Sequence, residues 1–435
     1  MTMQDTAQDE RQVMAKMARH LLPILVLMFL IAFIDRQNVG FAKLQMRHDL
    51  GMTEAAYGLA SSLFFIGYLL FEVPSTLALH KFGARMWLAR IMLTWGAVTV
   101  AMAFTRSMPV FCVLRFALGV AEAGFYPGVI YYLTLWFPQS YRTRVLGVFT
   151  LGSSLANMLG SLIGGALLGM NGIAQLAGWQ WVFVATGLPA VLVAVAALRL
   201  LPASIEDARF LSDEQKRIAR AALVREQSQE ATSGHPWMAF FDWRVLLFAV
   251  TYMLMSTSLY GVTYWLPTLV KSFGVTDVAN GMLNMLPWAG ATLLLLWLPG
   301  KLRRSGEVVT AMGLIAVVGA LGFAGSFLLP STGARFTALV LGGMCIPLLY
   351  PCFWSLPPRF FAGARAAASV AAINSIGNLG GFFSQNLMPF VAKTVGTASA
   401  PMLVPIVCLA TLCIGALAVR VSPARHRMLN VGAVG

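Results

Sequence analysis

Long runs of apolar residues, separated by short polar connections, fill the chain from residue 18 to residue 420. A run of ~20 mostly apolar residues is long enough to span the ~30 Å hydrocarbon core of a bilayer as a helix. The pattern predicts twelve such helices, at 18–40, 54–79, 86–105, 108–133, 143–168, 179–201, 242–271, 279–299, 308–329, 335–357, 366–392 and 399–420. We therefore expect an all-α membrane protein.

Composition agrees with this pattern. The chain is 58% hydrophobic and 11% charged, with a mean hydropathy of +0.74, which exceeds what a water-soluble core of ordinary proportions can hold. The first twenty residues are rich in charge and lack the short apolar core and cleavage site of a signal peptide. The first helix is therefore expected to be retained.

The formal net charge of +14 is distributed unevenly. Basic residues gather in the N-terminal segment and in every second connection, whereas the intervening connections hold only Lys43, Arg47, Arg106, Lys271, Arg335 and Lys393. This asymmetry predicts that both termini lie in the cytoplasm. No basic stripe is interleaved with stacking aromatic residues, which argues against nucleic-acid binding, and attraction to anionic lipid accounts for the excess charge.

The five cysteines all fall within predicted helices, without CxxC spacing or a nearby histidine. They are interpreted as small apolar side chains in the core, and no metal site is expected.

The longest polar interval, residues 202–237, suggests a division of the chain. We expect an N-terminal six-helix half at 1–201, a cytoplasmic linker at 202–240 and a C-terminal six-helix half at 241–435. Within the linker, Ser212 with Gln215 three residues later predicts the N-cap of a short amphipathic helix on the membrane surface. Its charges suit either a solvated linker face or a docking role.

Loop signals recur at a fixed offset along the chain. Gly83 is separated from Gly306 by the same distance in sequence as Arg142 is from Arg365. This repeat predicts two related six-helix halves about an axis normal to the membrane, an arrangement in which the substrate site lies at the midplane between the halves.

Ionisable residues deep inside predicted helices occur mainly in the N-terminal half. Asp35, Arg36, Arg115 and Glu122 have neutral counterparts at the same offset in the second half. Each such charge costs ~2.5–3.5 kcal/mol on insertion scales, so these groups are expected to face a cavity or one another and to mark an ion or substrate path. The alternative is that they only neutralise one another as buried pairs.

The fourth predicted helix places Arg115 and Glu122 on one face, because they are seven residues apart. Gly119 lies between them and leaves room for another helix or a ligand, and Tyr126 continues the face. In the second helix, Glu72 lies near the cytoplasmic end and is interpreted as a packing or loop-closing residue, with Tyr68 one turn earlier facing a central cavity.

The C-terminal half carries neutral polar groups in its helices instead. Tyr260, Tyr264, Asn374 and Asn378 are the main candidates. Asn374 and Asn378 share a face because they are four residues apart. Such groups either join helices or contact a ligand, and ligand contact is the interpretation we favour for the two asparagines beside three glycines.

Several stretches together carry a family resemblance: "FIDRQNVGFA", "YLLFEVPS", "KFGAR", "LRFALGVAEAGFYPG", "WFPQSYRTR", "GWQWVF", "FWSLP" and "NSIGNLGG". Through them the chain resembles the major facilitator superfamily, and more closely its anion:cation symporter family. That family includes transporters for tartrate, phthalate, hydroxyphenylacetate and sugar acids. The stretches extend over all twelve predicted helices, which makes them specific for the family but not for a substrate.

The resemblance implies roles for individual residues. It implies that Asp35 and Glu122 are protonation sites and that Arg36 binds the substrate carboxylate, while Arg115 holds the acids in a charge network. Tyr68 and Asn378 would line the site. The cytoplasmic loops and gate would include Glu72, Lys81, Gly83, Arg85, Arg142 and Arg144.

The chain departs from the family pattern at three places. His80 stands where the superfamily usually has an aspartate, Ser153 where sugar-acid transporters have a glutamine, and Ser384 to Asn386 read "SQN" in place of "GPY". These differences bear on the cytoplasmic latch, on recognition of sugar acids and on the shape of the eleventh helix.

The expected function is proton-coupled import of a small organic anion across a bacterial inner membrane by a monomer that needs no cofactor. An anion enters the cell against an inside-negative potential, so accompanying protons are needed. The alternatives are an exporter or exchanger of the same fold and, more remotely, a carboxylate-binding sensor. No nucleophile–base pair or metal cluster suggests an enzyme.

Overall fold

The computed structural model describes residues 3–227, 242–297, 305–361 and 363–421, and these residues form helices and connecting turns. The α-helices are α1 (Met3–Asp49), α2 (Glu54–Phe82), α3 (Ala84–Met102), α4 (Met108–Glu122), α5 (Phe125–Thr134), α6 (Gln139–Leu168), α7 (Gly178–Leu200), α8 (Asp213–Gln227), α9 (Trp243–Lys271), α10 (Asp277–Trp297), α11 (Ser305–Leu328), α12 (Thr332–Trp354), α13 (Pro357–Phe360), α14 (Gly363–Val395) and α15 (Leu403–Val421).

Twelve long helical segments correspond to the twelve predicted helices in the described part of the chain, with α4 and α5 forming one bent segment. Eight segments meet a length and hydropathy criterion for crossing a membrane. The remaining four, α3, α6, α10 and α14, carry more polar or small residues, and several of these residues contact other helices. The expectation of an all-α membrane fold is confirmed.

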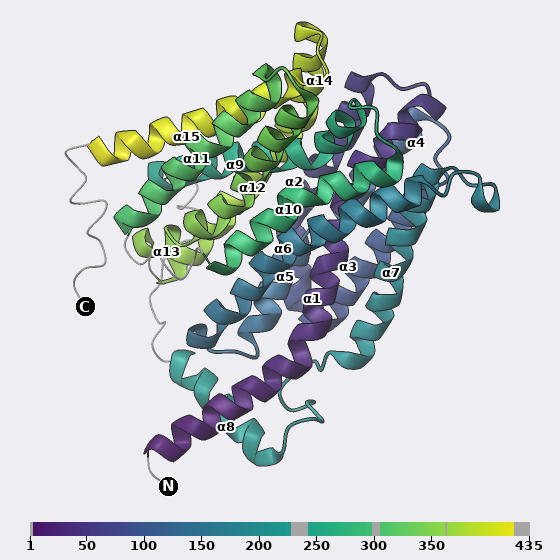
Figure 1. The fold of residues 1–435 in the computed structure, drawn as a ribbon. Helices are drawn as coiled ribbons and strands as arrows, with labels where there is room; N and C mark the ends of the chain where they lie inside the picture. The colour runs from purple at the N-terminus through teal and green to yellow at the C-terminus, as the bar shows by residue number, and fades with distance from the viewer. Residues whose placement is uncertain (1–2, 228–241, 298–304, 362, 422–435) are drawn as a thin grey trace.

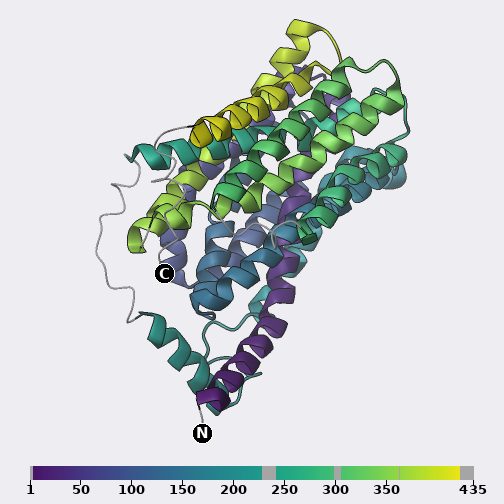
Figure 2. The same cartoon turned by 60° about the vertical axis from the view of Figure 1, so that its left-hand side comes forward.

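The helices pack in two groups. In the first group, α3 lies against α7, α2 lies against α4, and α1 lies against α6 and α7. In the second group, α9 lies against α14, and α11 lies against α12 and α15. Figures 1 and 2 show the purple-to-blue helices on one side of the bundle and the green-to-yellow helices on the other. The groups meet where α6 packs on α10, α2 on α14 and α1 on α9. The domain boundaries at 201, 240 and 241 remain predictions.

Glycines permit the closest helix contacts. A Cβ at Gly119 of α4 would lie 2.8 Å from the backbone nitrogen of Tyr68 in α2, and a Cβ at Gly165 of α6 would lie 2.6 Å from the Cα of Gly281 in α10. Both separations are too short for a side chain. Of the two possibilities left open for Gly119, close approach of a helix is therefore the one observed.

The fourth predicted helix is broken. Gly124 adopts φ 83°, ψ 0° between α4 and α5, a left-handed conformation that glycine accepts without steric cost. The predicted span over 108–133 corresponds to one candidate membrane span, Met108–Thr134, whose helix is interrupted at Gly124. The break places Glu122 at the last turn of α4 and Tyr126 at the first turn of α5.

Helix α8 lies beside the N-terminal part of α1, at the end of the bundle where the chain begins (Figures 1 and 2). The predicted capping box is present, because the Gln215 backbone N–H donates to Ser212 Oγ (3.3 Å) and the Ser212 N–H donates to Gln215 Oε1 (3.2 Å). Lys16 Nζ donates to Gln215 Oε1 at 2.9 Å, and Arg225 pairs with Glu10 at 2.6 Å. Much of the rest of the predicted linker lies outside the described residues.

Candidate functional site

A cavity of about 150 Å³ lies between the two groups of helices. Its twenty lining residues come from α1, α2, α5 and α6 on one side and from α9, α10, α12 and α14 on the other. Half of them are aromatic, and five are neutral polar residues: Ser153, Ser154, Asn157, Asn374 and Asn378. Among the described lining residues, Arg36 alone carries a charge. The cavity is therefore mainly aromatic, with one cation in its wall.

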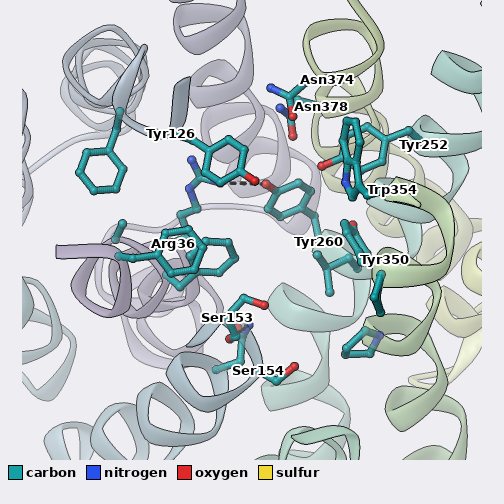
Figure 3. Close-up of a pocket in the computed structure, with 18 of the residues that line it drawn as sticks. Arg36, Tyr126, Ser153, Ser154, Tyr252, Tyr260, Tyr350, Trp354, Asn374 and Asn378 are labelled. Carbon is teal, nitrogen blue, oxygen red and sulfur yellow. Dashed lines mark hydrogen bonds between the residues drawn. The ribbon is translucent and has the colours of Figure 1, made fainter. Parts of the chain in front are cut away.

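Arg36 is held by one acid and one phenol. Its Nε and Nη2 lie 2.7 Å and 2.5 Å from the same carboxylate oxygen of Glu122, Oε1, and its Nη1 donates to Tyr260 Oη at 3.1 Å (Figure 3 shows the last bond). The Arg36 side chain is 14% exposed, whereas that of Glu122 is fully buried. Arg36 therefore reaches the cavity while its counterion lies behind it.

The Arg36 guanidinium also lies among aromatic rings. Its Cζ is 5.5 Å from the ring centroids of Phe33 and Tyr68 and 5.8 Å from that of Phe64. These separations are within cation–π range and help to hold the cation in a membrane interior. Tyr68 lines the cavity, in the position expected from the sequence.

Asp35 points away from the cavity. Its Oδ2 accepts hydrogen bonds from Trp95 Nε1 (2.8 Å) and Thr99 Oγ1 (3.2 Å) of α3, and its Oδ1 accepts one from Asn38 Nδ2 (3.0 Å). The residue is 2% exposed and does not line the pocket. The neighbouring charges Asp35 and Arg36 therefore lie on different faces of α1, and Asp35 is tied to the helices behind it.

Arg115 is buried next to α2. Its Nη2 donates to the Ser61 carbonyl at 3.2 Å, and its Cζ lies 5.1 Å from the Phe64 ring centroid. Within the described part of the chain it makes no ion pair within 4.0 Å, and it does not line the cavity. The charge network expected through Arg115 therefore involves no direct ion pair in this conformation, and its role remains a prediction.

The second group of helices supplies the facing wall. In Figure 3, Tyr252, Tyr350 and Trp354 lie across the pocket from Arg36, with Asn374 and Asn378 at one edge. Tyr260 reaches from this wall to Arg36, as its hydrogen bond shows. Tyr264 lies outside the main cavity and lines a smaller hollow beside Lys43.

Glu72 joins the two groups of helices. Asn374 Nδ2 donates to its Oε1 at 3.1 Å, and Ser375 Oγ donates to its Oε2 at 2.7 Å, so α2 is bonded to α14 at this point. The acid therefore makes a bridging contact next to the pocket, and Asn374, one of the three asparagines that line the pocket, is part of it.

The loop between α2 and α3 has a defined geometry. Gly83 turns the chain with φ 84°, and Arg85 donates to the Leu198 carbonyl at the end of α7. Lys81 Nζ lies 5.5 Å from the Phe82 ring centroid. His80, which stands in place of the usual aspartate, packs edge-on against Tyr131 with ring centroids 4.2 Å apart. The side chains of Arg142 and Arg144 lie outside the described residues.

One charged cluster was missed by the sequence pattern. Helix α1 continues to Asp49, past the predicted end at residue 40, and this places Lys43 inside the bundle at 4% exposure. Lys43 Nζ lies 2.7 Å from Glu54 Oε2 and 3.2 Å from the Trp265 ring centroid. This Lys43 cluster, formed by Lys43, Glu54 and Trp265, joins α1 and α2 to α9.

Several pocket residues were also missed: Asn157, Tyr252 and Trp288. Each lies in an apolar run in which one polar or aromatic residue gives no distinctive signal. The spacing of Tyr252 from Tyr260 and Leu259, about two turns of one helix, was the available clue.

Among the described residues, no cluster of three His, Cys, Asp or Glu side chains could hold a metal ion.

Comparison with known proteins identifies the family. Residues 25–385 match the Major Facilitator Superfamily. The chain is 45% identical over 376 residues to a quinolone resistance transporter of Acinetobacter baumannii, covering 86% of this chain and 87% of the relative. It is 39% identical over 389 residues to a putative tartrate transporter of Agrobacterium vitis, covering 89% and 87%.

A solved structure supports the same fold. A D-xylose–proton symporter aligns with a TM-score of 0.70 at 15% identity, covering 92% of this chain and 96% of that structure. The family match, the relatives that align over most of their length and the fold all indicate the same family. Because the two relatives named above are bacterial, they indicate an inner-membrane location. The chain belongs to the major facilitator superfamily and is a multi-pass membrane transporter of small molecules, not an enzyme.

Proposed function

We propose that this transporter imports a small organic anion together with protons by alternating access. The observation that carries the proposal is the position of Arg36, the one charged residue of the described cavity wall, with Glu122 as its buried counterion. A guanidinium binds a carboxylate through two parallel hydrogen bonds, so Arg36 can exchange its internal partner for a substrate.

Glu122 links substrate to proton in this proposal. Its Oε1 takes both bonds from Arg36, and its Oε2 is buried with no hydrogen-bond partner among the described residues. A proton on Glu122 would remove its charge and release Arg36 to the anion. An uncompensated buried charge is costly. Arg36 would therefore be paired in both states, with deprotonated Glu122 when the site is empty and with the substrate carboxylate when Glu122 is protonated. Asp35 is the second proposed proton site.

The contacts between helix groups include a closed layer at the end of the bundle opposite the one where the chain begins. In this layer, Lys43 packs on Trp265 and Gln45 Nε2 donates to Asp277 Oδ2 at 3.2 Å. The lining residues of α1 run from Phe29 to Arg36, on the N-terminal side of these contacts. With the termini in the cytoplasm, as the basic residues predict, these contacts close the outer end of the cavity, and on the cytoplasmic side the bonds from Asn374 and Ser375 to Glu72 still join the groups.

The test uses purified protein in liposomes with an inward proton gradient and labelled tartrate, phthalate, hydroxyphenylacetate and galactonate. Accumulation of one acid above its external concentration, abolished by a protonophore, supports symport. Uptake of one of these acids that is equal with and without the gradient would contradict proton coupling.

Export or exchange is the second candidate. It is favoured by the name of the 45% identical relative, a quinolone resistance transporter. The same arginine would then bind an anion on the cytoplasmic side for release outside. Counterflow that persists without a proton gradient, in the liposomes described above, would support exchange.

A further inference from the structure

The wall of the cavity opposite Arg36 is built from aromatic rings. Tyr252 of α9 lies edge-to-face against Tyr350 and Trp354 of α12, with ring centroids 5.8 Å and 5.1 Å apart. All three line the cavity, and Figure 3 shows them grouped across the pocket from Arg36. We refer to Tyr252, Tyr350 and Trp354 as the aromatic wall. Such a wall offers faces and edges to a planar ring, and its two phenols and one indole N–H are its polar groups.

The charge of the cavity limits the charge of the ligand. Arg36 is the one charged residue among the described lining residues, and Arg115 is directed to the Ser61 carbonyl instead of the cavity. A second carboxylate would therefore lie in an aromatic environment without a cation, where an unpaired charge is strongly disfavoured. A monoanion matches this cavity better than a dianion.

Its polarity limits the rest of the ligand. A polyhydroxylated acid must have each buried hydroxyl bonded, because an unsatisfied polar group loses its hydration. Half of the lining residues are aromatic, five of them tyrosines, and two of the polar groups are already engaged, because Asn374 donates to Glu72 and Tyr260 accepts from Arg36. The cavity of about 150 Å³ is comparable to an engineered apolar cavity that binds benzene. Both features suit one aromatic ring.

We propose that the substrate is an aromatic monocarboxylate, with its carboxylate on Arg36 and its ring against the aromatic wall, and that Trp354 determines this specificity. The inference rests on the proposed function, because it assigns the substrate class of the same site. Arg36 and the wall lie on different helix groups, so such a ligand would bridge the two groups across the cavity.

The experiment is equilibrium binding to the purified full-length protein by calorimetry, with phenylacetate, gluconate and L-tartrate as probes. Phenylacetate is expected to bind at least about 10-fold more tightly than either of the others. Trp354→Leu should weaken phenylacetate binding by about 10-fold, and Trp354→Phe should restore most of it because an aromatic face returns. Trp297→Leu is the matched control, since Trp297 is 58% exposed and lies outside the cavity lining.

Arg36→Gln separates this inference from the proposed function. If gluconate or tartrate binds as tightly as phenylacetate, and Arg36→Gln abolishes that binding while Trp354→Leu does not change it, the aromatic assignment is overturned and the anion site stands. If phenylacetate binds equally well to Arg36→Gln, the anion site itself is wrong and both proposals fail. If none of the three acids binds, the aromatic assignment also fails.

Discussion

Arg36 bonds to one carboxylate oxygen of Glu122 and leaves the other without a partner. Nε and Nη2 both contact Oε1, at 2.7 Å and 2.5 Å, while Oε2 is buried and has no hydrogen-bond partner in the described part of the chain. The pair is therefore asymmetric, with a cation that reaches the cavity and an acid that retains a free acceptor. This arrangement is the structural basis for the coupling that we propose.

Removing only the cation should damage both binding and stability. Arg36→Gln leaves Glu122 buried without a counterion, and breaking a buried pair in this way costs about 3–5 kcal/mol. We expect no detectable anion binding and a lower melting temperature in detergent. The double variant Arg36→Gln/Glu122→Gln should regain stability but not binding, as measured by calorimetry and thermal unfolding. Binding retained in the stable double variant would refute the carboxylate role of Arg36.

Removing the proton site should separate exchange from accumulation. Glu122→Gln keeps a neutral group that resembles the protonated acid, so substrate binding and counterflow should persist, whereas proton-driven accumulation should fall by at least about 10-fold, within the range that coupled sites control. Parallel uptake and counterflow assays in liposomes measure the two activities. An equal loss of both would indicate that Glu122 only maintains the fold.

The Lys43 cluster should stabilise the conformation that is closed at its end of the bundle. Trp265→Leu removes the ring beneath Lys43 Nζ, a contact at 3.2 Å that joins α1 to α9. A desolvated cation–π contact contributes about 2 kcal/mol, which corresponds to a population shift of roughly 30-fold. Spin labels at His48→Cys and Val278→Cys, in α1 and α10, should report a larger fraction of long distances.

The control for this comparison is Trp297→Leu, which removes an exposed tryptophan of α10. It should leave the distance distribution unchanged. Identical distributions in Trp265→Leu and the wild-type protein would show that the Lys43 cluster does not contribute to closure.

Gly124 should tolerate no side chain. Alanine there adds a Cβ in a left-handed conformation, at a cost of about 1–2 kcal/mol. The new Cβ would also collide with Ser75, because it would lie only 2.8 Å from the Cβ of Ser75. Gly51→Ala is the matched control, because Gly51 has φ 62° with open space around it. Thermal unfolding should show a larger loss for Gly124→Ala, and equal losses would contradict the packing argument.

The fold was predictable because membrane helices depend on local composition. Each apolar run marked a helix, and the offset that pairs Gly83 with Gly306 indicated the repeat. The ends of helices were less predictable. Lys43 was expected in a connection, but α1 carries it into the bundle, where Glu54 and Trp265 compensate its charge. Tertiary contacts of this kind are not encoded in local hydropathy.

The candidate site was predictable where charge marked it. Arg36 and Glu122 stood out because ionisable residues are rare in membrane helices. The packing of Asp35 against α3 was not predictable, since it depends on the donors Trp95 and Thr99. Of the aromatic wall, Tyr252 was equally hidden, because aromatic residues in membrane helices occur on lipid-facing and cavity-facing sides alike.

The most direct test of the central claim is proton movement during transport. Liposomes containing the protein and an internal pH dye are given the acid that they accumulate most strongly from the panel above, at equal pH on both sides. The account predicts internal acidification that depends on the acid, is absent in the Arg36→Gln/Glu122→Gln double variant, and is lost in Glu122→Gln although counterflow remains. Substrate uptake without any change of internal pH in the wild-type protein would contradict it.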